Sequence, residues 1–311
     1  MSALTTVTIL ALACPVLFAS NRTSIPNVPV RMIITMGHNH GHPATPLTRD
    51  DLTITMHYDS LPIVNLVPLR GDENPLDLYI LVDSCSSCDP GSKFEELHRF
   101  ILSQPPTTSI GVAYILDGHL RIAEAPTRDR ERAVKALNVP AGGKPSDPFR
   151  ALAELARQWT ATSSRHAVVM ISNGVDPNSR GDLEDPLAEA AIEAAQRSQT
   201  PVFTIYHPSA DYREAHPLAI YSGQVQLAHV AAETGGEAYF INEGPIATLV
   251  PFLSDISEHL SNQYVLEFLT KDTGGAAGLE SVTIEPKNSD VDVMAPYKVW
   301  VAGDSDSPSK W

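Results

Sequence analysis

The sequence predicts an α/β protein whose main domain is a doubly wound, mostly parallel sheet. Three mainly apolar runs occur at residues 78–82, 167–171 and 201–206, and the first two have no polar break. Such runs are typical of strands that are buried on both faces of a parallel sheet. Amphipathic stretches alternate with these runs, which is the order of β-α-β units. With 43% hydrophobic residues in 311, the chain has enough apolar material for this core.

Helices are predicted wherever apolar residues recur at helical spacing. Phe94, Leu97 and Ile101 give this spacing directly after the first apolar run. A hairpin of two strands is expected around the turn at Asp117-Gly118, from residues 110–116 to 120–123. Further helices are expected at residues 130–137, 149–159, 187–197, 228–234 and 246–260, with one more strand at 238–241. The region of residues 74–262 is therefore predicted as one α/β domain.

Both ends of the chain are predicted to form short strands. Before the α/β domain these are residues 30–36, 52–56 and 63–66, and after it residues 264–269, 281–285 and 297–301. We expect the N-terminal segment, residues 24–70, and the C-terminal segment, residues 263–303, to form one β-sandwich-like module. The α/β domain would then be inserted between its two halves.

The N-terminus is predicted to be a secretory signal peptide over residues 1–20. Residues 3–19 are the longest apolar stretch, and small residues surround Ala19. The stretch is short for a membrane span and contains Pro15. We therefore expect export to the periplasm or the extracellular space, without stable membrane insertion after cleavage.

Charge and motifs exclude several functions. The formal net charge is -15 and no cluster of Lys and Arg occurs, so nucleic acid is not an expected partner. The sequence contains no nucleophile elbow, zinc-protease motif, phosphate loop or dinucleotide-binding glycine motif. We expect a protein that is not an enzyme.

A polar segment follows the first apolar run and contains Asp83, Cys85 and Ser87. Open α/β sheets bind ligands at the carboxyl ends of their strands. A carboxylate with nearby hydroxyl groups offers the hard oxygen ligands that Mg²⁺ and Mn²⁺ prefer. The segment is therefore the first candidate for a binding site.

This segment resembles the first part of the metal-ion-dependent adhesion site of von Willebrand factor type A domains. The family pattern is Asp-x-Ser-x-Ser, and here it reads Asp83-x-Cys85-x-Ser87. Residues 227–228 with 233–240 resemble the late helix-to-strand turn of the same domains. Residues 47–52 and 263–266 resemble the flanking segments of bacterial VWFA-related proteins of the acidobacterial type. The resemblance implies a von Willebrand factor type A or Rossmann-like fold. It also implies adhesion, or binding of a protein ligand, at the carboxyl edge of the sheet.

The resemblance further implies a metal site that is degenerate. The family's ligand positions correspond to Asp83, Ser87, Ser146 and Asn173. Asn173 stands where the family has an aspartate, which removes one negative charge, and Cys85 offers soft sulfur in place of a hydroxyl. We expect Mg²⁺ or Mn²⁺ to bind weakly. The carboxylates that could restore charge are Asp89, Asp147 and Asp176.

Two alternatives remain open from the sequence. Cys85 and Cys88 would be the only cysteines after signal cleavage, and in an oxidising compartment we expect them to form a disulfide. A Cys-x-x-Cys pair between a strand and a helix is also the site of thiol-disulfide oxidoreductases.

The second alternative is a transition-metal site. His38, His40 and His42 alternate and could bind such a metal from one side of an extended segment. The other interpretation of these histidines is a solvated loop.

Overall fold

The computed structural model describes residues 27–37, 46–70, 74–83, 91–138, 147–159, 164–175, 185–208, 217–240, 248–271, 277–288 and 291–302. Several predicted features lie outside these residues. They are the signal peptide, the three alternating histidines His38, His40 and His42, the loop residues Cys85, Ser87, Cys88 and Asp89, and the two positions Ser146 and Asp176.

A six-stranded, mostly parallel sheet forms the centre of the α/β domain, as the sequence predicts. Its strand order is β10-β9-β8-β5-β6-β7. Five strands are parallel, and β7 pairs antiparallel with β6 at one border. The strands are β5 (Leu76–Asp83), β6 (Thr108–Leu116), β7 (His119–Thr127), β8 (Arg165–Ser172), β9 (Val202–Tyr206) and β10 (Ala238–Tyr239).

The chain winds outward from β5 in both directions. From β5 it proceeds through β6 to β7, and it then returns to β8 on the other side and continues to β9 and β10. The strand order therefore reverses between β5 and β8, and doubly wound sheets bind ligands at the carboxyl ends of the strands at such a point. Asp83 is the last residue of β5, so the predicted site lies there.

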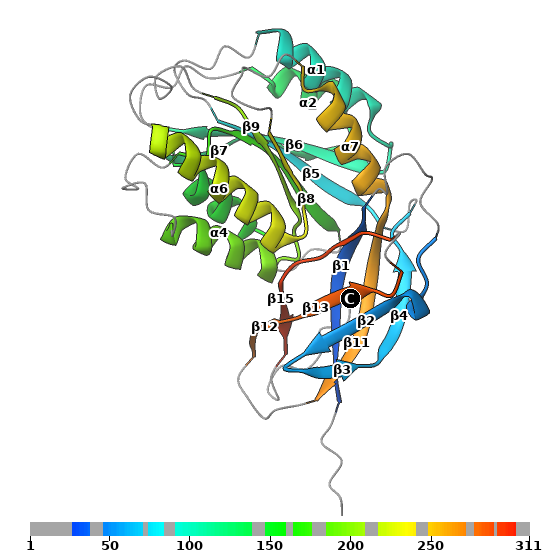
Figure 1. Ribbon diagram of the computed structural model, residues 1–311. Helices are drawn as coiled ribbons and strands as arrows, with labels where there is room; N and C mark the ends of the chain where they lie inside the picture. Colours follow the sequence, from blue (N-terminus) through cyan, green and yellow to red (C-terminus); the bar gives the residue numbers. More distant parts are fainter. Residues whose placement is uncertain are drawn as a thin grey trace, which may run out of the picture.

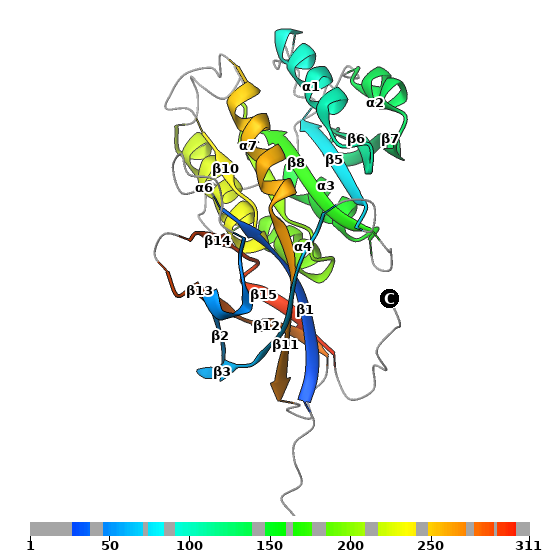
Figure 2. The same ribbon diagram turned by 90° about the vertical axis from the view of Figure 1, so that its right-hand side faces the viewer.

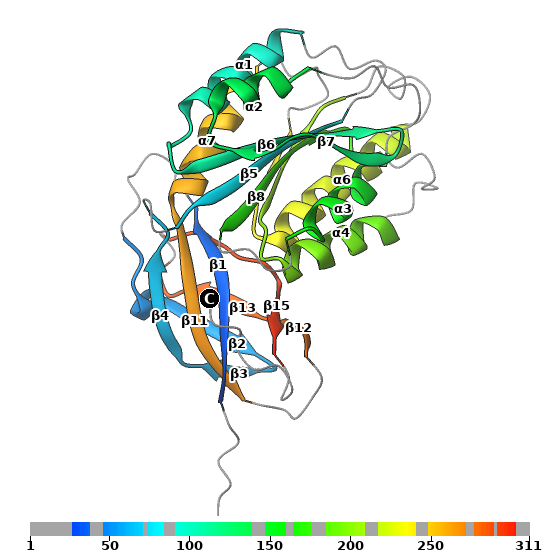
Figure 3. The same ribbon diagram turned by 180° about the vertical axis from the view of Figure 1, so that it is seen from behind.

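Helices cover both faces of this sheet (Figures 1 and 3). One face is covered by α1 (Gly91–Ser103), α2 (Arg130–Ala136) and α7 (Val250–Ser261). The other is covered by α3 (Pro148–Ala156), α4 (Pro186–Arg197) and α6 (Pro217–Thr234). Side chains alternate along a strand, so Leu78 and Ile80 join the first core while Tyr79 and Leu81 join the second.

Strands from both ends of the chain pair with one another below the α/β domain (Figure 1). The strand β1 (Asn27–Met36) runs antiparallel to β11 (Gln263–Lys271), and β11 also pairs with β4 (Ile63–Pro68). Met32, Ile34 and Phe268 contribute to a common core. The remaining elements are η1 (Arg49–Asp51), β2 (Leu52–Met56), β3 (Asp59–Leu61), β12 (Gly278–Ser281), β13 (Thr283–Pro286), β14 (Val293–Met294) and β15 (Lys298–Val301).

One predicted strand differs from the structure. Residues 281–285 were expected to form a single strand, but the chain divides into β12 and β13 at the buried Val282. β12 pairs with β15, whereas β13 pairs with β2. The backbone N–H of Val282 donates to the Tyr297 carbonyl, so this residue is the point at which the chain changes sheets.

The paired terminal strands contact the amino end of the parallel sheet. α7 ends at Ser261 and β11 begins at Gln263, so one element leads directly into the other (Figure 2). The guanidinium of Arg197 in α4 lies 4.5 Å from the ring centre of Trp300 in β15.

The domain boundaries at residues 24–70, 74–262 and 263–303 stay predictions. Among the described residues, no helix is both long and apolar enough to cross a membrane.

Candidate functional site

Asp83 and Ser172 lie side by side at the carboxyl ends of β5 and β8. The two strands pair in parallel register up to Val82 and Ile171, which places the next residue of each strand at the same edge. The Ser172 hydroxyl donates to Asp83 Oδ2 at 2.8 Å. Both residues are buried. The Asp83 carboxylate is therefore held in position by the neighbouring strand.

The next loop, Asn173-Gly174, follows directly from Ser172. The Gly174 N–H donates to Ser172 Oγ at 3.0 Å, and the Val175 N–H donates to Asn173 Oδ1 at 2.9 Å. Gly174 has a φ of 68°, and a Cβ there would lie 2.3 Å from the carbonyl oxygen of Gly223 in α6. Only glycine fits this combination of backbone conformation and close approach. The loop is thus held between β8 and α6, and the Asn173 amide oxygen accepts a hydrogen bond from its own loop.

Asp147 is the described member of the three aspartates that could restore charge, and its carboxylate is already engaged. It is the N-cap of α3, where Oδ1 accepts from the Arg150 N–H at 3.1 Å. Its Oδ2 lies 2.8 Å from Arg150 Nε. A helix N-terminus and a guanidinium both stabilise the charged carboxylate. The negative charge of Asp147 is therefore largely compensated by its own helix.

A cationic side chain approaches the same edge from α1. Lys93 Nζ lies 3.3 Å from His207 Nε2, and the backbone N–H of His207 donates to the Ser172 carbonyl at 2.8 Å. The ammonium group thus lies near the residue that follows β9, one strand away from Ser172. The positive charge of the Lys93 ammonium group disfavours the binding of a metal cation at this edge.

Exposed apolar side chains border this edge on α6 and β10. Leu218 is 78% exposed and Tyr221 is 60% exposed, both close in sequence to Gly223, which contacts the Asn173-Gly174 loop. Phe240 follows β10, and its ring centre lies 6.3 Å from that of Tyr206. The edge therefore combines buried polar groups with exposed apolar ones.

Two of the four predicted ligands, Asp83 and Asn173, lie at this common edge, and Ser87 and Ser146 are outside the described residues. Ser172 was missed as a partner, although a serine that ends a buried strand beside Asn173 was a usable signal. The described donors are one carboxylate, one hydroxyl and one amide oxygen. Their type fits a hard cation, but a single anionic group and the nearby Lys93 fit only weak binding.

No family model matches the sequence, and no curated protein matches it. Solved structures with a similar arrangement include the vWF domain of the type V pili tip protein Mfa5 from Porphyromonas gingivalis. It has 13% identity and a TM-score of 0.44, and the match covers 60% of this chain and 95% of that one. Another is the ArnB paralog VWA2 from Sulfolobus acidocaldarius, with 10% identity, a TM-score of 0.42, and coverage of 89% and 77%.

With the motif at Asp83 and a doubly wound sheet, the chain is similar to von Willebrand factor type A domains.

Proposed function

We propose that the chain is a non-catalytic module that binds a protein ligand at the carboxyl edge of its parallel sheet. The observation that supports this is the convergence of Asp83, Ser172 and Asn173 at the point where the strand order reverses. Ser172 donates to Asp83, and the Gly174 and Val175 N–H groups donate to Ser172 and Asn173, so hydrogen bonds hold the edge in one shape. A preformed surface loses less entropy on binding.

The chemistry of the edge suits a protein partner. Leu218, Tyr221 and Phe240 offer apolar and aromatic surface, and aromatic side chains are enriched at protein interfaces. The polar groups Asp83, Ser172 and Asn173 beside them are buried, and they would orient the bound partner. Exposed apolar groups with polar residues at their border are typical of protein interaction sites.

A divalent ion is a secondary feature of this proposal. Asp83 and Asn173, with Ser87 and Ser146 as implied by the resemblance, would hold Mg²⁺ or Mn²⁺ weakly. When bound, the ion would supply a positive contact for an acidic side chain of the partner.

We further propose that residues 1–20 direct export, which N-terminal sequencing of the mature protein tests.

Comparative capture tests the proposed surface. Three immobilised baits are used: the wild type, the double variant Leu218→Ser/Tyr221→Ser, and Tyr58→Asn, which removes an aromatic ring that is fully exposed in the β2–β3 turn. A partner of this edge is retained by the wild type and by Tyr58→Asn and is lost from the double variant. Equal retention by all three baits would place the binding surface elsewhere.

Cys85, Cys88 and the three alternating histidines lie outside the described residues. No described contact therefore favours the thiol-disulfide oxidoreductase or the histidine-loop metal binder over the docking module.

A further inference from the structure

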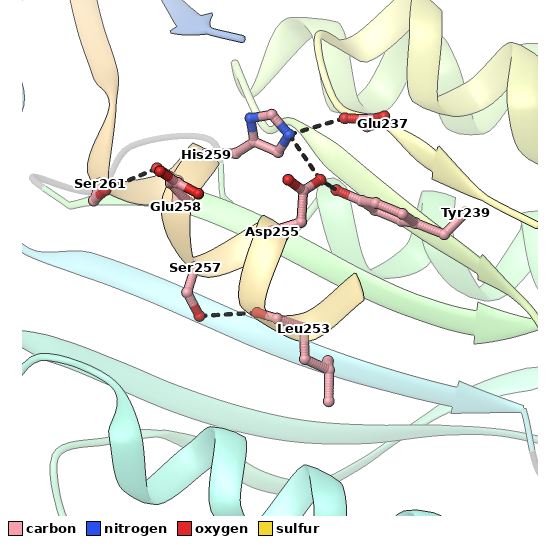
Figure 4. A network of polar contacts seen from close by, with 8 residues as sticks. All are labelled: Glu237, Tyr239, Leu253, Asp255, Ser257, Glu258, His259 and Ser261. Carbon is pink, nitrogen blue, oxygen red and sulfur yellow. Dashed lines mark hydrogen bonds and ion pairs between the residues drawn. The ribbon is translucent and has the colours of Figure 1, made fainter. Parts of the chain in front are cut away.

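A second polar cluster lies at the opposite end of the parallel sheet, where the strands begin. Glu237 immediately precedes β10, and Asp255 and His259 lie one turn apart on α7 (Figure 4). β10 is parallel to β9, so a residue before it lies at the amino end of the sheet. This cluster is separate from the edge that carries Asp83.

Three ligand atoms converge within this cluster. His259 Nε2 lies 2.8 Å from Glu237 Oε2 and 3.1 Å from Asp255 Oδ2. Glu237, Asp255 and His259 each offer an atom within 4.8 Å of the other two. Two ligands of one tetrahedral zinc ion lie about 3.3 Å apart, given metal–ligand distances of about 2.0–2.2 Å. The two distances from His259 Nε2 would need to lengthen by only a few tenths of an ångström for these atoms to bind one ion.

The surroundings hold the three side chains in this arrangement. Asp255 and His259 are four residues apart on a helix, so they project from the same side. The Tyr239 hydroxyl donates to Asp255 Oδ2 at 2.7 Å, which orients that carboxylate (Figure 4). The His259 ring stacks on Phe203, with ring centres 6.0 Å apart. Such supporting contacts are characteristic of metal ligands, whose orientation they fix.

Burial within the cluster is uneven in a way that suits an ion. The His259 side chain is 3% exposed, whereas those of Glu237 and Asp255 are 43% and 34% exposed. The imidazole is therefore packed against the protein interior, whereas the two carboxylates face solvent. An ion can approach from that side, and a water molecule can complete its coordination.

A hydrogen-bonded salt bridge explains this geometry less completely. A single N–H on Nε2 points at one acceptor, yet two carboxylate oxygens lie within 3.1 Å of that nitrogen. Two carboxylates also carry more negative charge than one imidazolium can balance. A divalent ion in place of the Nε2 proton would contact all three atoms and balance both carboxylates, with release of that proton when the ring is protonated there.

We propose that Glu237, Asp255 and His259 form a binding site for a divalent transition metal of the zinc class. The choice of metal follows from the ligands, because imidazole suits Zn²⁺ and its neighbours, whereas Mg²⁺ prefers oxygen alone. The site lies where α7 passes into β11, so a bound ion would also connect β10 to the start of the terminal-strand pairing.

Calorimetric titration with Zn²⁺ tests the site on the full chain. The background carries His38→Asn, His40→Asn and His42→Asn, which removes the other histidine candidate. We expect about one Zn²⁺ per chain in this background, and an affinity at least about tenfold weaker after His259→Gln or Glu237→Gln. Mg²⁺ at the same concentration should not compete.

A matched control uses the His229–Glu189 pair, whose Nε2–Oε1 distance of 2.9 Å resembles the distances at His259. This pair has one carboxylate, and His229→Gln should leave Zn²⁺ binding unchanged.

Zn²⁺ should also raise the unfolding temperature of the background chain and not that of the His259→Gln variant. Absence of Zn²⁺ binding in the background, or equal binding after both ligand substitutions, would overturn the proposal. Glu237 is the more exposed ligand, so its variant keeps the test valid if His259→Gln fails to fold.

Discussion

The two ends of the parallel strands treat their carboxylates differently. At the carboxyl end, Asp83 accepts a hydrogen bond from the Ser172 hydroxyl, which stabilises a buried anion without neutralising it. At the amino end, Glu237 and Asp255 both face one nitrogen of His259. Metal affinity rises with the number of anionic ligands that converge. Among the described residues, the group with more converging carboxylates therefore lies at the amino end, and not at the edge that carries the motif at Asp83.

The largest effect is expected from breaking the support of the carboxyl end. Gly174→Ala forces a side chain into a φ of 68° and against the Gly223 carbonyl oxygen. The left-handed backbone costs about 1–2 kcal/mol and overpacking adds about 1–3 kcal/mol, so we expect a loss of about 3 kcal/mol or more. Urea unfolding measures this loss.

A matched glycine separates the two contributions to that loss. Gly118 has a φ of 79° in the half-buried turn between β6 and β7. Gly118→Ala should therefore cost only the backbone part, about 1–2 kcal/mol. Equal losses for the two variants would show that Gly174 does not depend on its contact with α6.

A second buried histidine, His166, lies at the amino end of β8. His166 stacks on Trp159 with ring centres 4.7 Å apart, and Asp77 Oδ2 lies 3.9 Å from its Nδ1. Burial lowers the pKa of His166 to about 4. Burial also raises the pKa of Asp77. His259 Nε2 has two carboxylate oxygens within 3.1 Å, whereas the Asp77 carboxylate lies 3.9 Å from His166 and the His166 ring stacks on Trp159.

The lowered pKa of His166 predicts a loss of stability in acid. Above pH 6.5 the ring is neutral in both the folded and the unfolded chain. Between pH 6.5 and pH 4 the unfolded chain binds the proton first, so the free energy of unfolding should fall by about 3 kcal/mol from this group. Urea unfolding at pH 7 and pH 4.5 should show a smaller decrease for His166→Gln than for the wild type. His229→Gln is the control, and identical profiles for His166→Gln and wild type would contradict the prediction.

The metal affinity of the carboxyl end gives a smaller effect. Asn173→Asp adds an anionic oxygen beside Asp83, and a hard cation should then bind about tenfold more tightly, which corresponds to about 1.4 kcal/mol. Calorimetry with Mg²⁺ and Mn²⁺ measures the change. Unchanged affinity for both ions would mean that the charge at position 173 does not limit binding at this edge.

The central sheet could be predicted because its signal is local. Apolar runs at residues 78–82, 167–171 and 201–206 became β5, β8 and β9, since a strand that is covered on both faces needs mostly apolar residues. Thr204 in β9 is the exception, and its hydroxyl donates to the Leu227 carbonyl. The turn at Asp117-Gly118 likewise gave the β6–β7 hairpin. Helix α6 was longer than expected, because residues 217–227 lack a strong apolar periodicity and are helical through packing on the sheet.

The amino-end cluster could not be predicted in the same way. Glu237 lies before a two-residue strand and His259 near the end of a helix, so their contact depends on how α7 packs against β10. The spacing of Asp255 and His259 was a local signal, but this spacing is common on helices with no ligand. At the carboxyl end, Asp83 and Asn173 could be placed together because both follow predicted neighbouring strands.

The smallest loss of stability is expected from Asp147→Asn, which removes a charge at the carboxyl end but keeps the N-cap of α3. Asp147→Asn keeps a good N-cap residue on α3 but removes the ion pair with Arg150, whose side chain is 44% exposed. Partly exposed ion pairs contribute little, so we expect a loss of about 0.5 kcal/mol in urea unfolding. Affinity for Mg²⁺ should be unchanged, because the helix and Arg150 already compensate the carboxylate. A clear loss of Mg²⁺ affinity would instead show that Asp147 contributes its charge to the ion, and the carboxyl end would then hold two anionic groups, as the amino end does.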